Sequence, residues 1–220
     1  MYEYTDKQLS RAKRKIRSEF NRIQKLPLDQ ISISETRKLT KQMYKSLVDS
    51  NAEIYEQIAN KAYRDALRSA GAKKSDSKDK KLGAKWVALL LAAYNPITGY
   101  LYESETDRKR LRLFEQMLTA KEFHSRQMLR EYAKTAANLW WTQTEQYGVG
   151  ITDAATMQAY VDVGVKHVRW NAQNDGRECK TCKERDQKVY RIEDAPAKAH
   201  YRCRCYYTPV LEMEGDASGD

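Results

Sequence analysis

The segment that decides the fold is NDGRECKTCKERDQKVYRIEDAPAKAHYRCRC, residues 174–205, because it holds every thiol of a 220-residue chain. A C-x-x-C pair is followed by a histidine and two more cysteines in HYRCRC. Two thiolates at C-x-x-C spacing converge on one ion when the turn between them points backbone N–H groups at the sulfurs. The pattern therefore favours a structural zinc site with five candidates for four tetrahedral positions. The candidate ligands are Cys179, Cys182, His200, Cys203 and Cys205.

Three other chemistries fit part of this pattern. An even number of cysteines permits two disulfides, although the cytoplasmic synthesis expected for this chain disfavours them. A thioredoxin-like redox motif needs its C-x-x-C between a parallel strand and a helix, and no such context surrounds Cys179. A catalytic zinc needs an open water position, and neither H-E-x-x-H nor the H-x-E signature of the deaminases is present. A metal that holds together a segment too short to bury its own core is the favoured interpretation.

The residues around the cysteines predict a small antiparallel sheet. YVDVGVKHVRW (160–170) alternates valines and then changes phase, which is typical of a strand with a bulge. KVYRI (188–192) and RCRCYYTPVL (202–211) are two further strands by their β-branched and aromatic content. We expect residues 151–211 to form a zinc-binding module. The acidic residues 212–220 are expected to be a disordered tail.

The first 150 residues predict long helices, because apolar side chains recur every three or four positions. Ser32 and Glu35 have the spacing of a capping box, and Gly148 and Gly150 are expected to end the last long helix. The expected class is α+β, with a mostly helical region at 1–150 followed by a small β module stapled by zinc. The expected helices cover 5–26, 32–70 with one break near Ser50-Asn51, 86–94 as a buried core helix, 104–147, and 152–160 as one or two turns.

The chain is strongly basic. Its 40 lysines and arginines against 30 acidic residues give a formal net charge of +10, which favours contact with an acidic partner such as nucleic acid. Three basic clusters, one of them in a loop at 71–85, are suited to sequence-independent phosphate contacts, or else form ordinary solvated faces. The predicted DNA-binding residues are Arg11, Lys13, Arg14, Lys15, Arg17, Lys73, Lys74, Arg108, Lys109 and Arg110.

We expect synthesis in the cytoplasm and no membrane partner. The opening MYEYTDKQLSRAKRKIRSEF is charged almost at once and lacks the pattern of a secretory signal. The longest apolar run, Trp86–Tyr94, is far shorter than the roughly 20 residues that span a bilayer.

Together these residues resemble the C-terminal motif of the phage Mu F-like family, the minor head proteins of phage head morphogenesis. The family pattern has a tryptophan, an aspartate before C-x-x-C, a hydrophobic strand and a terminal H-P-x-C-R-C. The resemblance covers about residues 160–210, and Tyr201 departs from it by standing where the family usually has proline. The glycine often found after C-x-x-C is also missing. The matching residues are Trp170, Asp175, Arg177, Cys179, Cys182, Pro196, His200, Cys203, Arg204 and Cys205.

The resemblance implies a virion structural protein, not an enzyme, at or near the portal. Such a protein acts in head assembly and in DNA packaging or delivery, with the phage portal protein and DNA as partners. It would be made in the host cytoplasm during assembly. Asp175 and Arg177 flank the first cysteine pair and are predicted to orient the zinc loop. The alternative is a zinc-containing nuclease or toxin-like enzyme, which would need a free histidine or paired carboxylates near the module. The acidic residues from Glu178 to Asp194 show no such spacing.

Overall fold

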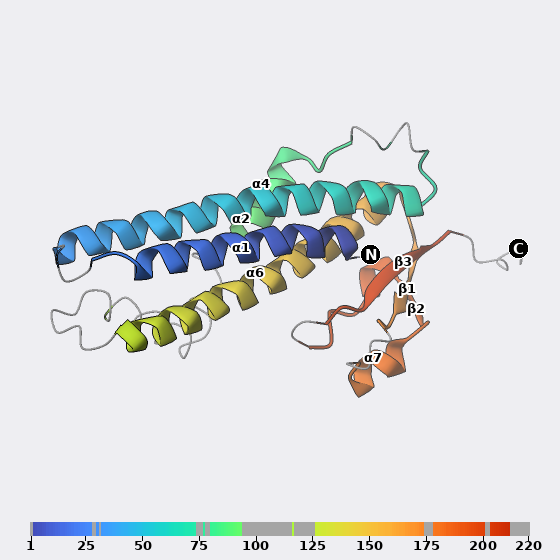
Figure 1. The fold of residues 1–220 in the computed structure, drawn as a ribbon. Coiled ribbons are helices and arrows are strands. Elements are labelled where there is room, and N and C mark those ends of the chain that lie inside the picture. The colour runs from blue at the N-terminus through green and yellow to red at the C-terminus, as the bar shows by residue number, and fades with distance from the viewer. Residues whose placement is uncertain are drawn as a thin grey trace, which may run out of the picture. The chain divides into compact units, whose positions relative to one another are not determined.

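The structure is a computed structural model, and it describes residues 2–27, 30, 32–73, 77, 80–93, 116, 126–173, 178–200 and 203–211. Its elements run in the order α1, α2, α4, α6, β1, α7, β2, η2 and β3 (Figure 1). The chain divides into two compact units. The sheet unit comprises the described residues of Met1–Tyr2, Ile58–Gly83 and Val149–Asp220, and the helical unit those of Glu3–Gln57 and Ala84–Gly148. The sequence-based division into 1–150, 151–211 and 212–220 stays a prediction.

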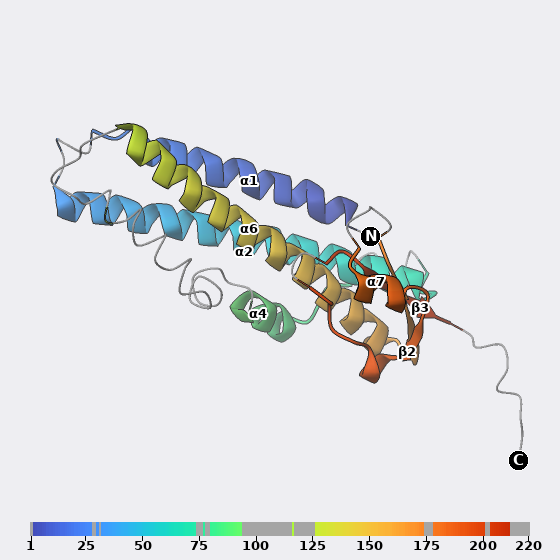
Figure 2. The same ribbon diagram turned by 90° about the horizontal axis from the view of Figure 1, so that it is seen from below.

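The helical unit is built mainly on three long helices. α1 is Glu3–Gln24, α2 is Ile33–Ser69 and α6 is Arg126–Asp162, and the last two continue into the sheet unit. Figures 1 and 2 both show α1 running beside the first part of α2 and of α6. Each helix turns one apolar face toward the other two, as the three-to-four-residue spacing predicts. The buried core consists of Ile16, Phe20, Ile23, Met43, Leu47, Leu129, Ala133, Ala136 and Trp140.

α2 begins as predicted but does not break. The Ser32 hydroxyl accepts a hydrogen bond from the backbone N–H of Glu35 at 3.1 Å, so the predicted cap is formed. The break expected near Ser50-Asn51 is wrong, since the helix is continuous there. Asn51 is buried, and its Nδ2 donates to the Thr144 hydroxyl at 3.0 Å. The polar residue that suggested a break is therefore a link between two helices.

The glycines at 148 and 150 do not end α6, which continues to Asp162 and absorbs the separate short helix expected at 152–160. Gly148 is buried, and a Cβ atom placed on it would lie 2.6 Å from Leu9 Cδ2. A side chain at this position would require Leu9 to shift, so glycine here permits the close approach of α1 and α6. The part of the predicted helix at 104–125 lies outside the described residues, apart from Gln116.

α4, Ala84–Ala93, confirms the helix predicted for the apolar run but not its burial. Leu89 is 60% exposed, and Trp86 and Val87 are only half-buried. Nowhere in the described part of the chain does a helix combine the length and the apolar character needed to cross a membrane.

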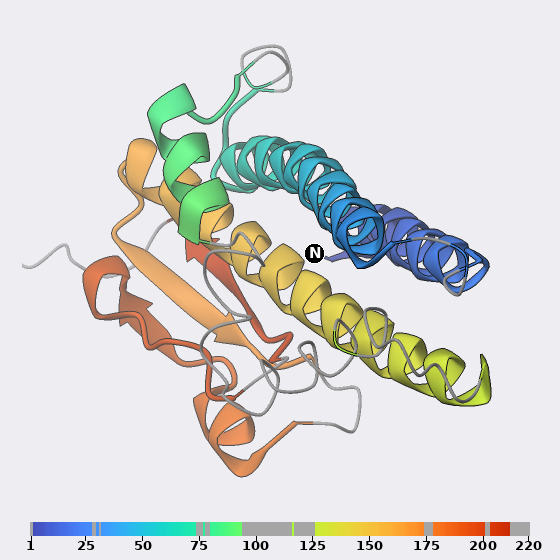
Figure 3. The same cartoon turned by 90° about the vertical axis from the view of Figure 1, so that its left-hand side faces the viewer.

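The sheet unit contains the predicted antiparallel sheet, in the order β2-β1-β3. β1 is His167–Asn171, β2 is Val189–Arg191 and β3 is Tyr206–Val210, and Trp170 of β1 lies opposite Tyr207 of β3. Figure 3 shows the strands side by side, with α7 (Lys180–Arg185) beyond one end of the sheet. The short 3-10 helix η2, Ile192–Asp194, follows β2. The class is α+β, as predicted.

Two strands begin several residues later than predicted. The strand expected from 160 begins only at His167, because α6 extends to Asp162 and a turn follows it. Val161 and Val163, whose alternation suggested a strand, are exposed. Cys203 and Cys205 precede β3 instead of lying in it. The tail at 212–220 lies outside the described residues.

Candidate metal centre

The C-x-x-C pair forms the start of α7. Cys179 caps the helix in an extended conformation, and its Sγ accepts a hydrogen bond from the backbone N–H of Cys182 at 3.4 Å. This hydrogen bond lowers the pKa of the Cys179 thiol and so favours the thiolate. The thiolate is the form of cysteine that binds metal. The turn therefore has the geometry that the spacing predicts.

The other three candidates meet this pair at Cys182. Its Sγ lies 3.6 Å from His200 Nε2 and 3.6 Å from Cys203 Sγ. Two overlapping groups have ligand atoms within 4.8 Å of one another, namely Cys179 with Cys182 and His200, and Cys182 with Cys203 and Cys205. All five predicted ligands thus come together in one cluster that could hold a metal ion, with the buried Cys182 common to both groups.

The residues fit a metal such as zinc by their chemistry. Four thiols and one imidazole are the donor types that structural zinc sites use. Burial raises the pKa of Cys182 and of Cys205, so these sulfurs stay protonated unless a cation compensates their charge. All four cysteines are free thiols in the structure.

An apolar wall and a set of hydrogen bonds support the cluster. Trp170 of β1 is fully buried among Cys182, Cys203 and Cys205, and the Tyr207 ring meets it edge-on with centroids 5.2 Å apart. Asp186, the residue after α7, links this helix to the chain that follows β1. Its Oδ1 accepts a hydrogen bond from the backbone N–H of Ala172 at 2.7 Å.

Arg185, the last residue of α7, links this helix to the segment that follows η2. Its Nη1 donates to the carbonyl of Ala197 at 2.8 Å, and its guanidinium lies 5.2 Å from the Trp170 ring centroid. Asp175 and Arg177, predicted to orient the zinc loop, lie outside the described residues. Arg185 and Asp186, which no motif spacing distinguished in the sequence, make hydrogen bonds that orient α7.

A second polar cluster that the sequence did not predict adjoins the cysteines. Tyr2 is only 5% exposed; its hydroxyl donates to Asp153 Oδ1 at 2.6 Å and lies 3.3 Å from the carbonyl oxygen of Cys205. Lys198 donates to the Tyr2 hydroxyl at 3.1 Å and pairs with Asp153 at 3.2 Å. Burial raises the pKa of Tyr2, and the Asp153 charge raises it further. No sequence pattern relates residues this far apart.

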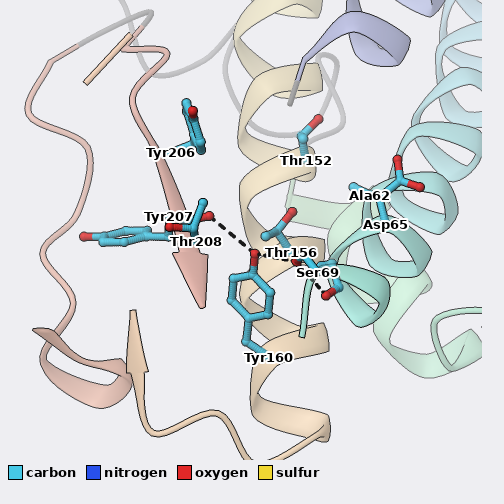
Figure 4. A pocket seen from close by; sticks show the side chains of 10 residues that line it. Ala62, Asp65, Ser69, Thr152, Thr156, Tyr160, Tyr206, Tyr207 and Thr208 are labelled. Carbon is cyan, nitrogen blue, oxygen red and sulfur yellow. Dashed lines mark hydrogen bonds between the residues drawn. The ribbon is translucent and has the colours of Figure 1, made fainter. Parts of the chain in front are cut away.

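The sheet unit also contains a cavity of about 210 Å³, shown in Figure 4. It lies between the end of α2, the end of α6 and β3, and no cysteine lines it. The Tyr160 hydroxyl lies 3.1 Å from the Ser69 hydroxyl and donates to the carbonyl of Tyr207 at 3.4 Å. The lining residues are Ala62, Asp65, Ala66, Ser69, Thr152, Thr156, Tyr160, Tyr206, Tyr207 and Thr208.

The five predicted DNA-binding residues of α1 do not all share one exposed face. Arg14 and Arg17 are exposed, and Arg11 is exposed while donating to Gln8 Oε1 at 2.7 Å. Lys13 instead lies over the Trp141 ring, 4.5 Å from its centroid, and Lys15 pairs with Glu19 at 2.7 Å.

The remaining predicted DNA contacts fall in two other places. Lys73 is exposed. Lys74 and the cluster of Arg108, Lys109 and Arg110 lie outside the described residues.

The fold and site define an α+β protein whose small C-terminal sheet is built around a thiol and imidazole cluster that could hold a metal. Residues 109–208 match the family model described as phage Mu protein F like protein. This match over less than half of the chain agrees with the family that the cysteine motif indicated, and the matched region includes that motif. No curated protein and no solved structure matches the chain. The family supports a phage head-morphogenesis protein, suggests a virion location and agrees with a structural role.

Proposed function

We propose that the protein is a minor head protein that associates with the phage portal and acts in head morphogenesis and in DNA packaging or delivery. The family match over residues 109–208 carries this proposal. The protein would be made in the host cytoplasm and would enter the virion at the head or portal region.

The proposed cofactor is one structural Zn²⁺, held by four of the five clustered side chains. Bound zinc would supply folding free energy to a module whose sheet has only three short strands. Two observations support this assignment. Cys182 belongs to both groups of candidate ligands, and the turn at Cys179 favours the thiolate.

Sequence-independent DNA contact is proposed for the exposed side of α1. Lys7, Arg11 and Arg14 occupy positions i, i+4 and i+7 of one helix and are all exposed, so they fall on one face. Arg17 is exposed one turn further on. Cations spaced along a helix release counterions when they meet phosphates, and this contact carries no sequence preference.

The proposal is tested by locating the protein in assembled particles. We expect mass spectrometry of purified heads to detect the chain, and we expect co-expression with the portal protein of the same phage to give one complex in size-exclusion chromatography. Absence from heads together with separate elution would overturn the portal assignment. Plasmid DNA incubated with zinc-loaded protein should stay intact, whereas cleavage would favour the nuclease alternative.

A further inference from the structure

We infer that Tyr2 is a positioning residue for the metal centre. Its hydroxyl holds the described residues of the ligand-bearing segment, 198–200 and 203–205, in the conformation that a metal needs, and a bound metal in turn keeps Tyr2 buried. This inference rests on the proposed metal site. It assigns a role to a side chain that precedes α1 and lies far from the cysteines in the sequence.

Tyr2 contacts both ends of the ligand-bearing segment. Three of the five candidate ligands lie between Lys198 and Cys205, the last ligand included. The Tyr2 hydroxyl accepts from Lys198 Nζ at 3.1 Å and lies 3.3 Å from the Cys205 carbonyl oxygen. One side chain therefore spans the segment that carries His200 and Cys203.

The described part of this segment has little regular structure to hold it. No helix or strand is assigned among its described residues, and the backbone N–H of Cys203 donates to the carbonyl of His200 at 3.2 Å. A segment without a hydrogen-bonded ladder depends on side-chain contacts for its conformation. Tyr2 supplies such contacts at two points.

Asp153 fixes Tyr2 to α6. Its Oδ1 accepts from the hydroxyl at 2.6 Å, and its Oδ2 pairs with Lys198 at 3.2 Å, so the same carboxylate holds both the tyrosine and the segment. The centroid of the Tyr2 ring also lies 5.7 Å from Lys198 Nζ and 5.3 Å from the guanidinium carbon of Arg204. Arg204 stands between the last two candidate ligands, so the ring and the hydroxyl both act on the ligand-bearing segment.

Removing only the hydroxyl would keep the ring and the Lys198–Asp153 pair, but Asp153 and Lys198 would each lose one hydrogen bond and the Cys205 carbonyl would lose its polar neighbour. Unsatisfied buried polar groups destabilise the conformation that buries them. Loss of a group that orients metal ligands typically costs 10–100-fold in metal affinity. Because the coupling between two sites is reciprocal, metal release should loosen Tyr2 by the same factor.

The test compares Zn²⁺ affinity of the full chain and its Tyr2→Phe variant by competition with a chromophoric chelator. Tyr63→Phe is the matched control, because Tyr63 also donates to a carboxylate, Asp162 Oδ2, at 2.5 Å in the same unit. We expect Tyr2→Phe to weaken Zn²⁺ binding about tenfold, and the control to change it less than about twofold. Equal affinities for wild type and Tyr2→Phe would overturn the inference, while a wild type that binds no zinc would overturn the metal site itself.

A second measurement on the wild-type chain does not depend on the variant folding. Nitration of tyrosines, quantified for each residue by mass spectrometry, reports how often each ring is exposed. We expect chelation to speed nitration of Tyr2 about tenfold or more, and that of Tyr63 much less. Unchanged nitration of Tyr2 on chelation would overturn the coupling.

Discussion

Glu19 is a nearly buried carboxylate that ties α1 together and links it to α2. It accepts from Lys15 at 2.7 Å, from Arg22 at 3.0 Å and from the Ser46 hydroxyl at 3.2 Å. Burial alone would raise the pKa of Glu19, but hydrogen bonds and charges from Lys15 and Arg22 outweigh burial and hold the pKa below its usual value. A carboxyl with a lowered folded-state pKa stabilises the protein above the unfolded-state pKa of about 4.3. That contribution is lost as the pH falls through the folded-state value.

Glu19→Gln should lower the free energy of unfolding at pH 7 by about 1 kcal/mol, a modest value because both cationic partners are half-exposed. The difference from wild type should shrink as the pH falls below about 4. Urea unfolding at pH 7 and in acid checks both statements, with the exposed Glu53→Gln as control. A deficit that persists unchanged in acid would contradict the role of the charge.

Gly148→Ala should destabilise the protein although alanine favours helix. The added methyl would meet three atoms of the buried Leu9, its Cδ2 at 2.6 Å, Cδ1 at 3.1 Å and Cγ at 3.2 Å. Overpacking of this kind costs about 1–3 kcal/mol, which exceeds the helix-propensity gain of about 1 kcal/mol. Thermal melting checks this, with Gly83→Ala as control because nothing lies within 4 Å of its added methyl. A more stable Gly148→Ala variant would show that Leu9 can move aside.

At the scale of elements, the periodicity of apolar side chains predicted where α1 and α2 lie. It failed at positions where a contact with another helix determines whether the helix continues. α1 and α2 follow from the spacing of apolar side chains, because those side chains form the buried core of the helical unit. Asn51 and Gly148 read as breaks because polar residues and glycine weaken isolated helices. Their partners, Thr144 and Leu9, lie on other helices, and no local pattern contains that contact.

The candidate site shows the same division. The clustering of the five candidate ligands could be predicted because a metal requires fixed spacings within two short motifs. Tyr2 and Asp153 could not, since their hydrogen bond joins residues 151 positions apart. Arg185 and Asp186 lie within the motif, but their hydrogen bonds depend on the path of the loop after α7.

Cys179→Ser should unfold the predicted zinc-binding module, residues 151–211, while leaving most helical signal intact, because Cys179 both caps α7 and is a candidate ligand. We expect elemental analysis to find about one zinc per wild-type chain, the stoichiometry of one tetrahedral site, and much less in the variant. Far-UV circular dichroism reports on the helices, and limited proteolysis with cleavage sites located by mass spectrometry reports on the surroundings of Trp170. Unchanged melting and full protease resistance in the variant would contradict a structural metal.

At the scale of the whole molecule, a net charge of +10 attracts polyanions regardless of any particular site. The contribution of a particular basic surface to DNA binding must therefore be separated from the contribution of the total charge. Arg14 and Arg17 are exposed on α1, whereas Lys45 and Lys180 are exposed cations that pair with Asp49 and Glu184. Both pairs of cations can be neutralised with the same change in net charge.

Binding to random-sequence DNA should weaken with salt, and the slope of log affinity against log salt should count phosphate contacts at about 0.9 each. If Arg14 and Arg17 both contact phosphate, Arg14→Gln with Arg17→Gln should reduce this slope by about 1.8. Lys45→Gln with Lys180→Gln should leave the slope nearly unchanged, because these cations already have carboxylate partners. Fluorescence anisotropy over a salt series measures all three proteins. Equal losses in the two double variants would assign the attraction to net charge and leave α1 without a specific part in holding DNA.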